Sequence, residues 1–325
     1  MIRINKKLQK EKDMYAIGVD VGGMSVKVGL VDEKGKIVSQ SRVKTEPTPE
    51  KLIAKLVEQI NTLLEEKSLT IKEIKGIGIG LPGAVDRGVV VHLPNLDWTN
   101  VNIVEILKKS FDTEIKISND ANVAALGEVI YGSAKNYNDC IMFTLGTGVG
   151  GGIIIDKKLY EGGHSRGAEL GHMTLILDGE PCTCGRNGCI ERYVSATALI
   201  EQTKQAMLLD KESLMWEFVG GDINKVDGKT AFECSKKGDK SAEKVRDTYI
   251  HYLGESILNM LNIFRPDAFI LGGGVSAQGK YLTDMVQEYC EKFEYGYPFS
   301  PKTEIITATL GNDAGIIGAA ALLSE

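Results

Sequence analysis

Four side chains with soft metal-binding atoms lie close together near the middle of the chain. They are His172, Cys182, Cys184 and Cys189. Three thiols and one imidazole are a usual ligand set of a closed, tetrahedral structural zinc site. The spacing therefore predicts a structural zinc ion, which would stabilise a loop that contains few apolar residues of its own.

Two acidic residues flank this cluster, Glu169 before it and Glu191 after it. A zinc-bound loop would hold both carboxylates in fixed positions without using them as ligands. Carboxylates fixed beside a cleft suit a ligand that is rich in hydroxyl groups, such as a sugar. A disulfide pair or three buried thiols are the alternatives to zinc. The other cysteines, Cys140, Cys234 and Cys290, are scattered singly, so the sequence shows no disulfide framework.

Two glycine-rich segments, 20–25 and 144–152, each join two apolar stretches and lie about 125 residues apart. Glycines at the tip of a hairpin let successive backbone N–H groups converge on an anion. Neither segment leads directly from a strand into a helix, and neither contains Gly-Lys-Ser/Thr, which excludes a dinucleotide fingerprint and a P-loop. One such segment alone would be an ordinary tight hairpin. The pair, together with a third turn at 272–274, predicts a nucleotide site.

Two aspartates are candidates for roles in catalysis. Asp20 ends the first predicted strand beside the first glycine turn, where it could hold Mg²⁺ through water or simply cap the turn. Asp120 starts a predicted helix, where the helix dipole favours its ionised form. Phosphoryl transfer to an alcohol needs one carboxylate that accepts the hydroxyl proton. Asp120 is the best-placed candidate, and a plain helix cap is the alternative.

Alternating strands and helices must position these side chains. Apolar runs predict strands over 15–21, 26–31, 37–43, 74–81, 114–118, 140–145, 153–156, 268–271 and 305–306. Helical spacing predicts helices over 49–65, 103–110, 121–131, 195–209, 241–264 and 277–293, and from 313 onward. Ser118 or Asn119 can cap the third of these helices. Strand, glycine turn and strand begin both halves, so the two halves resemble each other weakly.

The chain has 325 residues, more than one hydrophobic core usually serves, so we expect two domains. Its formal net charge of −6 argues against nucleic acid as a partner. No apolar run is as long as a membrane span, so no membrane partner is expected. Residues 1–13 are charged and polar and form no secretory signal, so we expect a frayed N-terminal extension and a cytoplasmic protein with reduced cysteines.

Six segments together closely resemble the ROK family, whose name stands for repressors, open reading frames and kinases. They are 19–23, 80–83, 119–128, 145–152, 169–172 and the cysteine motif 182–191. The resemblance covers the chain from about Met14 to its C-terminus. It implies the hexokinase/actin-like (ribonuclease H-like) α/β fold, in which two domains enclose a cleft for sugar and ATP. It also implies ATP-dependent phosphorylation of a hexose, usually at the 6-hydroxyl.

The resemblance also implies roles for individual residues. Asp120 corresponds to the catalytic base and is one of the sugar contacts, which also include Asn119, Glu169, His172 and Glu191. His172 would give one ring nitrogen to zinc and offer the other to a sugar hydroxyl. The residues implied to contact ATP or its Mg²⁺ are Asp20, Gly22, Gly23, Gly146, Thr147, Gly148, Gly150, Gly272, Gly273 and Gly274.

One position departs from the family pattern. The family usually has Thr where this chain has Met24, so a hydroxyl that could contact phosphate is missing. Ser25 is the candidate to replace it.

We expect a small α/β domain over 14–118 and a large α/β domain over 119–311 with the zinc loop at 172–189. The C-terminal helix, about 312–325, is expected to pack back on the small domain. Family resemblance further implies a homodimer or homotetramer. Thirteen residues before the first strand are too few for the helix-turn-helix domain of the family's repressors, so repression is disfavoured.

The leading hypothesis is a glucokinase that transfers the γ-phosphoryl group of ATP to the 6-hydroxyl of glucose. N-acetylglucosamine, N-acetylmannosamine and fructose, which differ from glucose near C2, are the alternative acceptors. A sugar sensor without catalytic activity is the alternative from a different class of protein.

Overall fold

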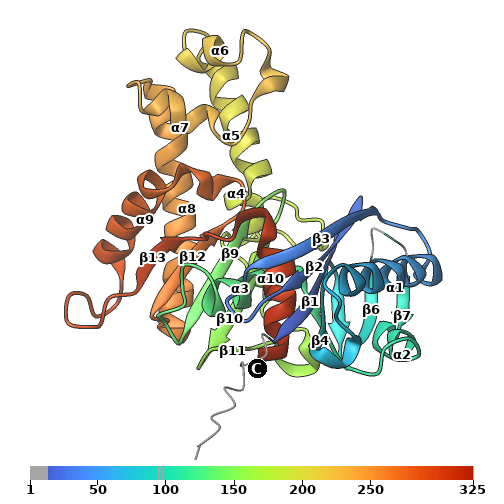
Figure 1. Cartoon of the computed structure of the whole chain (residues 1–325). Helices are drawn as coiled ribbons and strands as arrows, with labels where there is room; N and C mark the ends of the chain where they lie inside the picture. The colour runs from blue at the N-terminus through green and yellow to red at the C-terminus, as the bar shows by residue number, and fades with distance from the viewer. Residues whose placement is uncertain (1–13, 94–95, 97, 325) are drawn as a thin grey trace, which may run out of the picture.

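The computed structural model describes residues 14–93, 96 and 98–324, and it contains two five-stranded mixed sheets (Figure 1). The first sheet has the strand order β3-β2-β1-β4-β8. Its strands are β1 (Tyr15–Val21), β2 (Ser25–Val31), β3 (Ile37–Lys44), β4 (Ile74–Leu81) and β8 (Glu114–Asn119). The first three strands are antiparallel, whereas β4 pairs in parallel with β1 and with β8. The strands predicted for this sheet are confirmed.

The second sheet repeats this order as β11-β10-β9-β12-β13. Its strands are β9 (Cys140–Leu145), β10 (Val149–Ile155), β11 (Lys158–Leu159), β12 (Ala268–Gly272) and β13 (Glu304–Thr307). Here too a hairpin of antiparallel strands precedes the strands that pair in parallel. The similarity between the two halves, which is weak in the sequence, is therefore a repeated topology.

The second glycine-rich turn is shorter than predicted, because β10 begins at Val149 and not at Ile153. Gly150 and Gly152 consequently lie inside the strand. A Cβ at Gly150 would lie 2.8 Å from the Cβ of Ala121, and a Cβ at Gly152 would lie 2.5 Å from that of Ala125. These glycines let the helix that starts with Asp120 pack directly on the strand.

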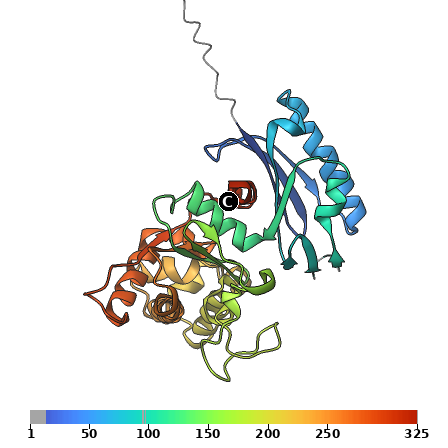
Figure 2. The same ribbon diagram turned by 90° about the horizontal axis from the view of Figure 1, so that it is seen from below.

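That helix, α3 (Asp120–Ile130), and α10 (Ala314–Ala321) lie between the two sheets (Figure 2). α10 contacts β1, β2 and β4 on one side and α3 on the other. Its backbone approaches so closely that a Cβ at Gly18 would lie 2.0 Å from the carbonyl oxygen of Ile316. On the other side, a Cβ at Gly318 would lie 1.8 Å from the carbonyl oxygen of Val123. α10 therefore joins the first sheet to the helix that carries Asp120.

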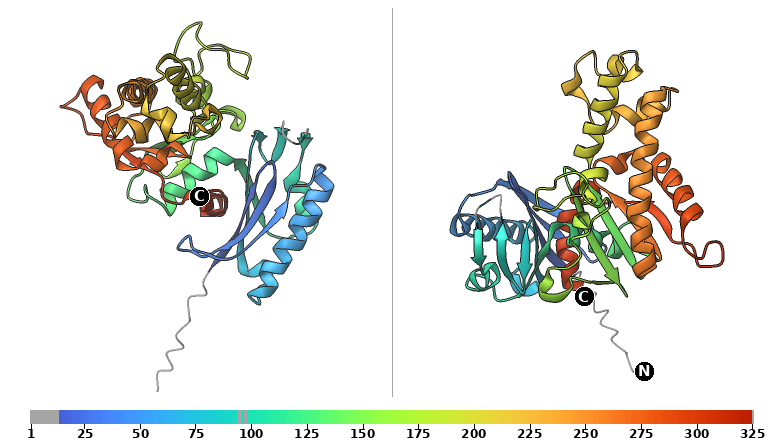
Figure 3. Two further views of the ribbon diagram at one scale, coloured as in Figure 1. Left: turned by 90° about the horizontal axis from the view of Figure 1, so that it is seen from above. Right: turned by 180° about the vertical axis from the view of Figure 1, so that it is seen from behind.

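The remaining helices cover the outer faces. α1 (Pro49–Glu66) packs on the first sheet. The helical layer of the second sheet rises above that second sheet in Figure 1, and it lies apart from α1 in both views of Figure 3. The helices of this layer are α4 (Glu191–Val194), α5 (Ala196–Leu209), α6 (Leu214–Phe218), α7 (Thr230–Ser235), α8 (Lys240–Phe264) and α9 (Lys280–Phe293). α9 begins three residues later than predicted because Gly279 has a φ of +60°, outside the helical region. In the described part of the chain, none of the helices is both long and apolar enough to cross a membrane.

The sequence did not predict α6, α7 or the small antiparallel sheet of β5 (Ala84–Asp86), β6 (Val89–Leu93) and β7 (Trp98–Val101), which precedes α2 (Ile103–Lys108). Such short elements contain too few residues to show a clear period. The described residues also contain short 3₁₀ turns. Among them are η1 (Ile71–Glu73), η3 (Gly163–Ser165), η4 (Leu170–His172), η5 (Ile223–Lys225), η6 (Val275–Gln278), η7 (Gly311–Asp313) and η8 (Leu322–Ser324).

Two large hydrophobic clusters form the interior. One contains buried side chains from 17 to 115, and the other contains buried side chains from 141 to 305. The division into a domain over 14–118 and a domain over 119–311 remains a prediction, and the expected extension over 1–13 lies outside the described residues.

Candidate active site

A pocket of about 440 Å³ opens between the two sheets, next to α3 and α10. Several of the predicted site residues line it together. They are Asp20, Asp120, Gly146, Gly148, Gly150, Glu191 and Gly273. The other predicted site residues are not part of its lining, namely Gly22, Gly23, Asn119, Thr147, Glu169, His172, Gly272 and Gly274. The fold therefore brings the candidate base, one flanking carboxylate and parts of two glycine turns to a single cavity.

Asp120 is the first residue of α3, and Asn119 is the N-cap. The N–H group of Ala121 donates to Oδ1 of Asn119 at 2.9 Å and to Oδ1 of Asp120 at 2.8 Å. The Asn119 amide also donates to the carbonyl of Gly83 at 3.2 Å, in the loop that follows β4. Asn119 therefore fixes the start of α3 against the first sheet, and it leaves the Asp120 carboxylate at the wall of the pocket.

The pKa of Asp120 is raised, contrary to the expectation from its place at a helix N-terminus. Desolvation by the surrounding protein is the largest cause, and the negative charges of Asp20 and Glu169 add to it. The hydrogen bond from Ala121 lowers the pKa but does not outweigh these effects. Although the side chain opens into the pocket, the protein around it makes its ionised form costly. Such a carboxylate accepts a proton more readily than an ordinary Asp.

Asp20 lies at the end of β1 and is held from two sides. Lys27 Nζ pairs with its Oδ2 at 3.1 Å and also donates to the carbonyl of Asn312 at 2.8 Å. Gly315 lies against its carboxylate, since a Cβ at that position would be 2.5 Å from Asp20 Cγ. Asp20 is thus fixed by an ion pair to β2 and by contact with α10.

The first glycine turn is held by Thr45, which the sequence reading did not single out. The Thr45 hydroxyl donates to the carbonyl of Gly22 at 2.6 Å, and its N–H group donates to the carbonyl of Met24 at 3.1 Å. The Met24 side chain is 86% exposed. Ser25, the candidate replacement for the missing hydroxyl, accepts a hydrogen bond from Arg42 Nε at 2.9 Å. Its hydroxyl therefore acts as an acceptor toward β3, and this bond does not use its O–H donor.

The second glycine turn is held by a hydrogen bond within the turn and by a second hydrogen bond to Glu191. Gly146 N–H donates to the carbonyl of Gly148 at 3.0 Å, and Val149 N–H donates to Glu191 Oε2 at 3.0 Å. A Cβ at Gly148 would lie 2.2 Å from that same Oε2, so only glycine leaves room for the carboxylate. Glu191 therefore joins the end of the cysteine loop to the turn at the wall of the pocket.

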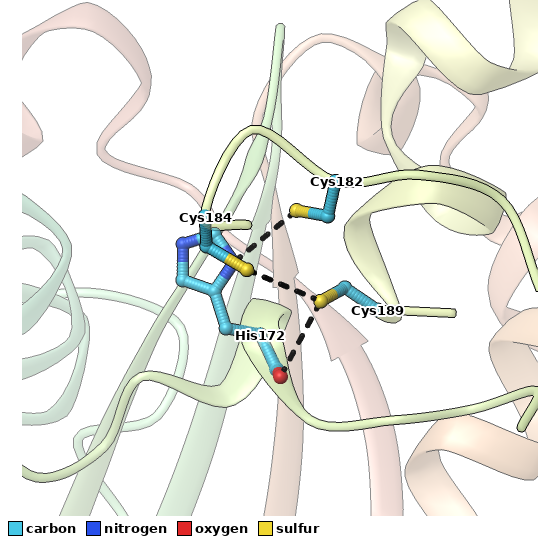
Figure 4. Close-up of side chains that lie close together, drawn as sticks. All are labelled: His172, Cys182, Cys184 and Cys189. Atoms are coloured by element: carbon cyan, nitrogen blue, oxygen red, sulfur yellow. Dashed lines mark hydrogen bonds between the residues drawn. The ribbon is translucent and has the colours of Figure 1, made fainter. Parts of the chain in front are cut away.

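The four candidate metal ligands converge (Figure 4). Their donor atoms all lie within 4.8 Å of one another, with Cys182 Sγ 3.6 Å from His172 Nδ1 and Cys184 Sγ 3.6 Å from Cys189 Sγ. Ligand atoms about 2.3 Å from a tetrahedral zinc ion are separated by about 3.8 Å, so the arrangement fits zinc. All six cysteines are free and Cys184 is exposed, which disfavours both a disulfide pair and three buried thiols.

The cluster is connected to the rest of the site. Cys182 Sγ lies 3.9 Å from Glu191 Oε1, so one carboxylate links the cysteine loop to the pocket. His172 directs Nδ1 toward the sulfur atoms, and its other ring nitrogen points away from them (Figure 4). This orientation is compatible with a nitrogen left free for a ligand.

The structure adds site residues that the sequence reading missed. Thr144, Gly311, Asn312 and Gly315 line the pocket. Glu161, in the loop before Glu169, accepts a hydrogen bond from the Ser118 hydroxyl at 2.5 Å, but it lines a separate cavity and not this pocket. The Gly-Ala composition of the C-terminal helix was the one sequence signal for Gly315, because close packing between layers needs small residues.

The repeated sheets with a cavity between them, lined by glycine turns and carboxylates, define a protein of the hexokinase/actin-like fold class with a site suited to phosphate and hydroxyl groups. The sequence profile of the ROK family matches residues 16–325. The chain belongs to the ROK family, and its fold is the predicted one.

Similar proteins are known over nearly the whole chain. The chain is 36% identical to a glucokinase of Thermotoga maritima and 34% identical to one of Streptomyces coelicolor, in each case over 95% of this chain and 97% of the relative. Among solved structures, a ROK family glucokinase from Streptomyces griseus, in complex with glucose and AMPPNP, is similar with a TM-score of 0.77 and 34% identity. That match covers 95% of this chain and 98% of the other.

Proposed function

We propose that this protein is a glucokinase, which transfers the γ-phosphoryl group of ATP to the 6-hydroxyl of glucose. The observation that carries the proposal is the position of Asp120 in one pocket with Glu191 and the glycines of the second turn. The glucose and AMPPNP complex of the similar Streptomyces griseus glucokinase gives the acceptor and the donor.

Asp120 accepts the proton of the attacking hydroxyl and orients its oxygen toward the phosphoryl group. Its raised pKa makes it a better base than an ordinary Asp. Asn119 keeps the start of α3 in register, so that the carboxylate stays in the pocket. The glycine turns supply backbone that can approach phosphate oxygens without side-chain obstruction.

Mg²⁺ supplies charge neutralisation between the phosphates of ATP when it is bound. Asp20 is the residue that would hold it, through water, because its carboxylate lines the pocket and is fixed by Lys27 and α10. Gly272, Gly273 and Gly274 are proposed on the adenosine side, where Gly273 reaches the pocket.

Zinc is proposed as a structural ion held by His172, Cys182, Cys184 and Cys189. It would fix the loop from which Glu191 leads into the pocket, and it would leave one ring nitrogen of His172 for a sugar hydroxyl. Glu169 is the remaining proposed sugar contact, and its negative charge contributes to the raised pKa of Asp120.

The test is a coupled assay of ADP release with glucose, N-acetylglucosamine, N-acetylmannosamine and fructose under identical conditions. We expect the highest kcat/KM with glucose. A higher value with an N-acetyl sugar or fructose would keep the kinase and change the acceptor. If no hexose stimulated ADP release while sugar still bound, the protein would be a sensor.

A further inference from the structure

Glu128 is a buried carboxylate at the far end of α3 from Asp120. Its side chain is fully buried, and within the described chain no Lys or Arg pairs with it. A carboxylate in such a position needs several hydrogen-bond donors to replace the water it has lost. Five donor groups from two separate segments surround it.

The two segments meet at the carboxylate. On one side, the N–H group and the hydroxyl of Ser133 donate to Oε2 at 2.9 and 3.1 Å. On the other side, the N–H groups of Thr309 and Leu310 donate to Oε1 at 2.8 and 2.7 Å, and the Thr309 hydroxyl lies 3.2 Å from Oε2. Ser133 follows α3 directly, whereas Thr309 is more than 180 residues away in sequence. The carboxylate therefore holds a distant segment on the end of α3.

The distant segment leads straight into the active-site pocket. Gly311 and Asn312, which follow Leu310, line the pocket together with Asp20 and Gly315. The Asn312 carbonyl accepts a hydrogen bond from Lys27, and Lys27 pairs with Asp20. A displacement of the segment would consequently move the groups around Asp20, while Asp120 would stay in place at the start of α3.

We propose that Glu128 is a positioning residue for the nucleotide. By accepting the N–H groups of Thr309 and Leu310, it fixes segment 309–312 against α3 and sets the distance between the Asp20 side of the pocket and Asp120. This inference rests on the proposed kinase function for its kinetic readout, although its effect on nucleotide binding does not depend on the acceptor.

Two variants of different chemistry test it. Glu128→Met keeps a similar volume and removes both acceptor oxygens, so segment 309–312 loses its partners. Glu128→Gln keeps one acceptor oxygen for the N–H groups of Thr309 and Leu310. On the other side, the hydroxyls of Ser133 and Thr309 can turn to accept from the new amide. We expect the Kd of a non-hydrolysable ATP analogue, measured by calorimetry, and the KM for ATP to rise about tenfold in the Met variant, equivalent to about 1.4 kcal/mol, and less in the Gln variant. The Kd of glucose measured without nucleotide should change less than twofold.

Ser133→Ala is the matched control, because it removes a donor to the same carboxylate from the α3 side and leaves segment 309–312 bonded. Its nucleotide Kd should equal that of the wild type. A residue with only a structural role would lower the folded fraction and the apparent kcat, with both Kd values unchanged. That result, or equal weakening of glucose and nucleotide, would overturn the proposal. Absence of hexose-dependent ADP release in the wild type would overturn the kinase function instead, and the analogue Kd values would still decide the role of Glu128.

Discussion

At the scale of single residues, Asp120 combines two opposing influences. A helix N-terminus and a hydrogen bond from Ala121 favour the ionised carboxylate, whereas desolvation and the charges of Asp20 and Glu169 disfavour it. The net effect is a raised pKa. A base in a partly desolvated pocket benefits from this balance, since the proton it accepts is held more firmly.

Replacing Asp120 by Asn should remove the base and retain the fold. We expect kcat to fall by about 10²–10⁴, the usual contribution of a positioned base, with zinc content unchanged. Because the folded pKa is raised, the ionised form destabilises the folded state at pH values above that pKa, so the neutral Asn should not lower the urea midpoint at neutral pH. Turnover close to that of the wild type would eliminate Asp120 as the base.

The pH dependence of the reaction should reflect the same shift. The base works only when ionised, so kcat/KM should decline as the pH falls through the pKa of Asp120. Since desolvation by the surrounding protein raises this pKa, the decline should begin above the ordinary Asp value of about 3.9. Rate measurements in buffers of decreasing pH, with zinc content determined at each point, test this. A rate that stayed constant down to the ordinary value would contradict the raised pKa.

At the scale of elements, the tip of the β9–β10 hairpin depends on contact with Glu191. Gly148→Ala would place a Cβ where Glu191 Oε2 now lies, 2.2 Å away. We expect the carboxylate to move and the Kd of glucose to rise about tenfold, which corresponds to one lost hydrogen bond to a charged group. Gly228→Ala is the control, because no neighbouring atom lies within 4 Å of a Cβ at that position. Equal glucose affinity in the two variants would remove Glu191 from the sugar site.

The loop that contains Cys182, Cys184 and Cys189 is the second element whose structure should determine sugar binding, through the proposed zinc ion. Cys184→Ser should reduce the zinc content and the glucose affinity together, because the loop that leads to Glu191 would lose one of its four anchors. Metal analysis and calorimetry on the same sample measure both quantities. Unchanged glucose binding in a metal-free Cys184→Ser protein would separate the metal from sugar recognition.

At the scale of the whole molecule, a group of aromatic side chains near the end of α9 faces solvent. Tyr295 is 85% exposed and Phe299 is 95% exposed. Exposed apolar groups of this kind commonly lie in interfaces between proteins. Together with the family resemblance, they favour an assembly of two or four copies of this chain.

Light scattering on the eluting protein should therefore give two or four times the chain mass of 35.3 kDa. The mass should be independent of glucose and ATP if the interface lies away from the cleft. A mass of one chain at micromolar concentration would contradict the expected homodimer or homotetramer.

Local patterns in the sequence determined most of the elements and the identities of the chemical groups. The long strands and helices show clear periods, and the spacing of His172, Cys182, Cys184 and Cys189 predicts a ligand cluster that the structure brings within 4.8 Å. Tertiary contacts decided the features that have no local signal. They start β10 at Val149, since its glycines must accommodate α3, and they bring the Ser25 hydroxyl to Arg42.

The sequence by itself determined which groups are present: a carboxylate at a helix start, glycine turns in two similar halves, and soft metal ligands at close spacing. Only the tertiary structure decided how these groups act on one another. It surrounded Asp120 with enough protein to reverse the effect of the helix dipole, and it brought Leu310 and Thr309 to the buried Glu128. Both outcomes depend on desolvation and on contacts between residues far apart in the chain. A local sequence pattern shows neither the desolvation of a side chain nor its distant contacts.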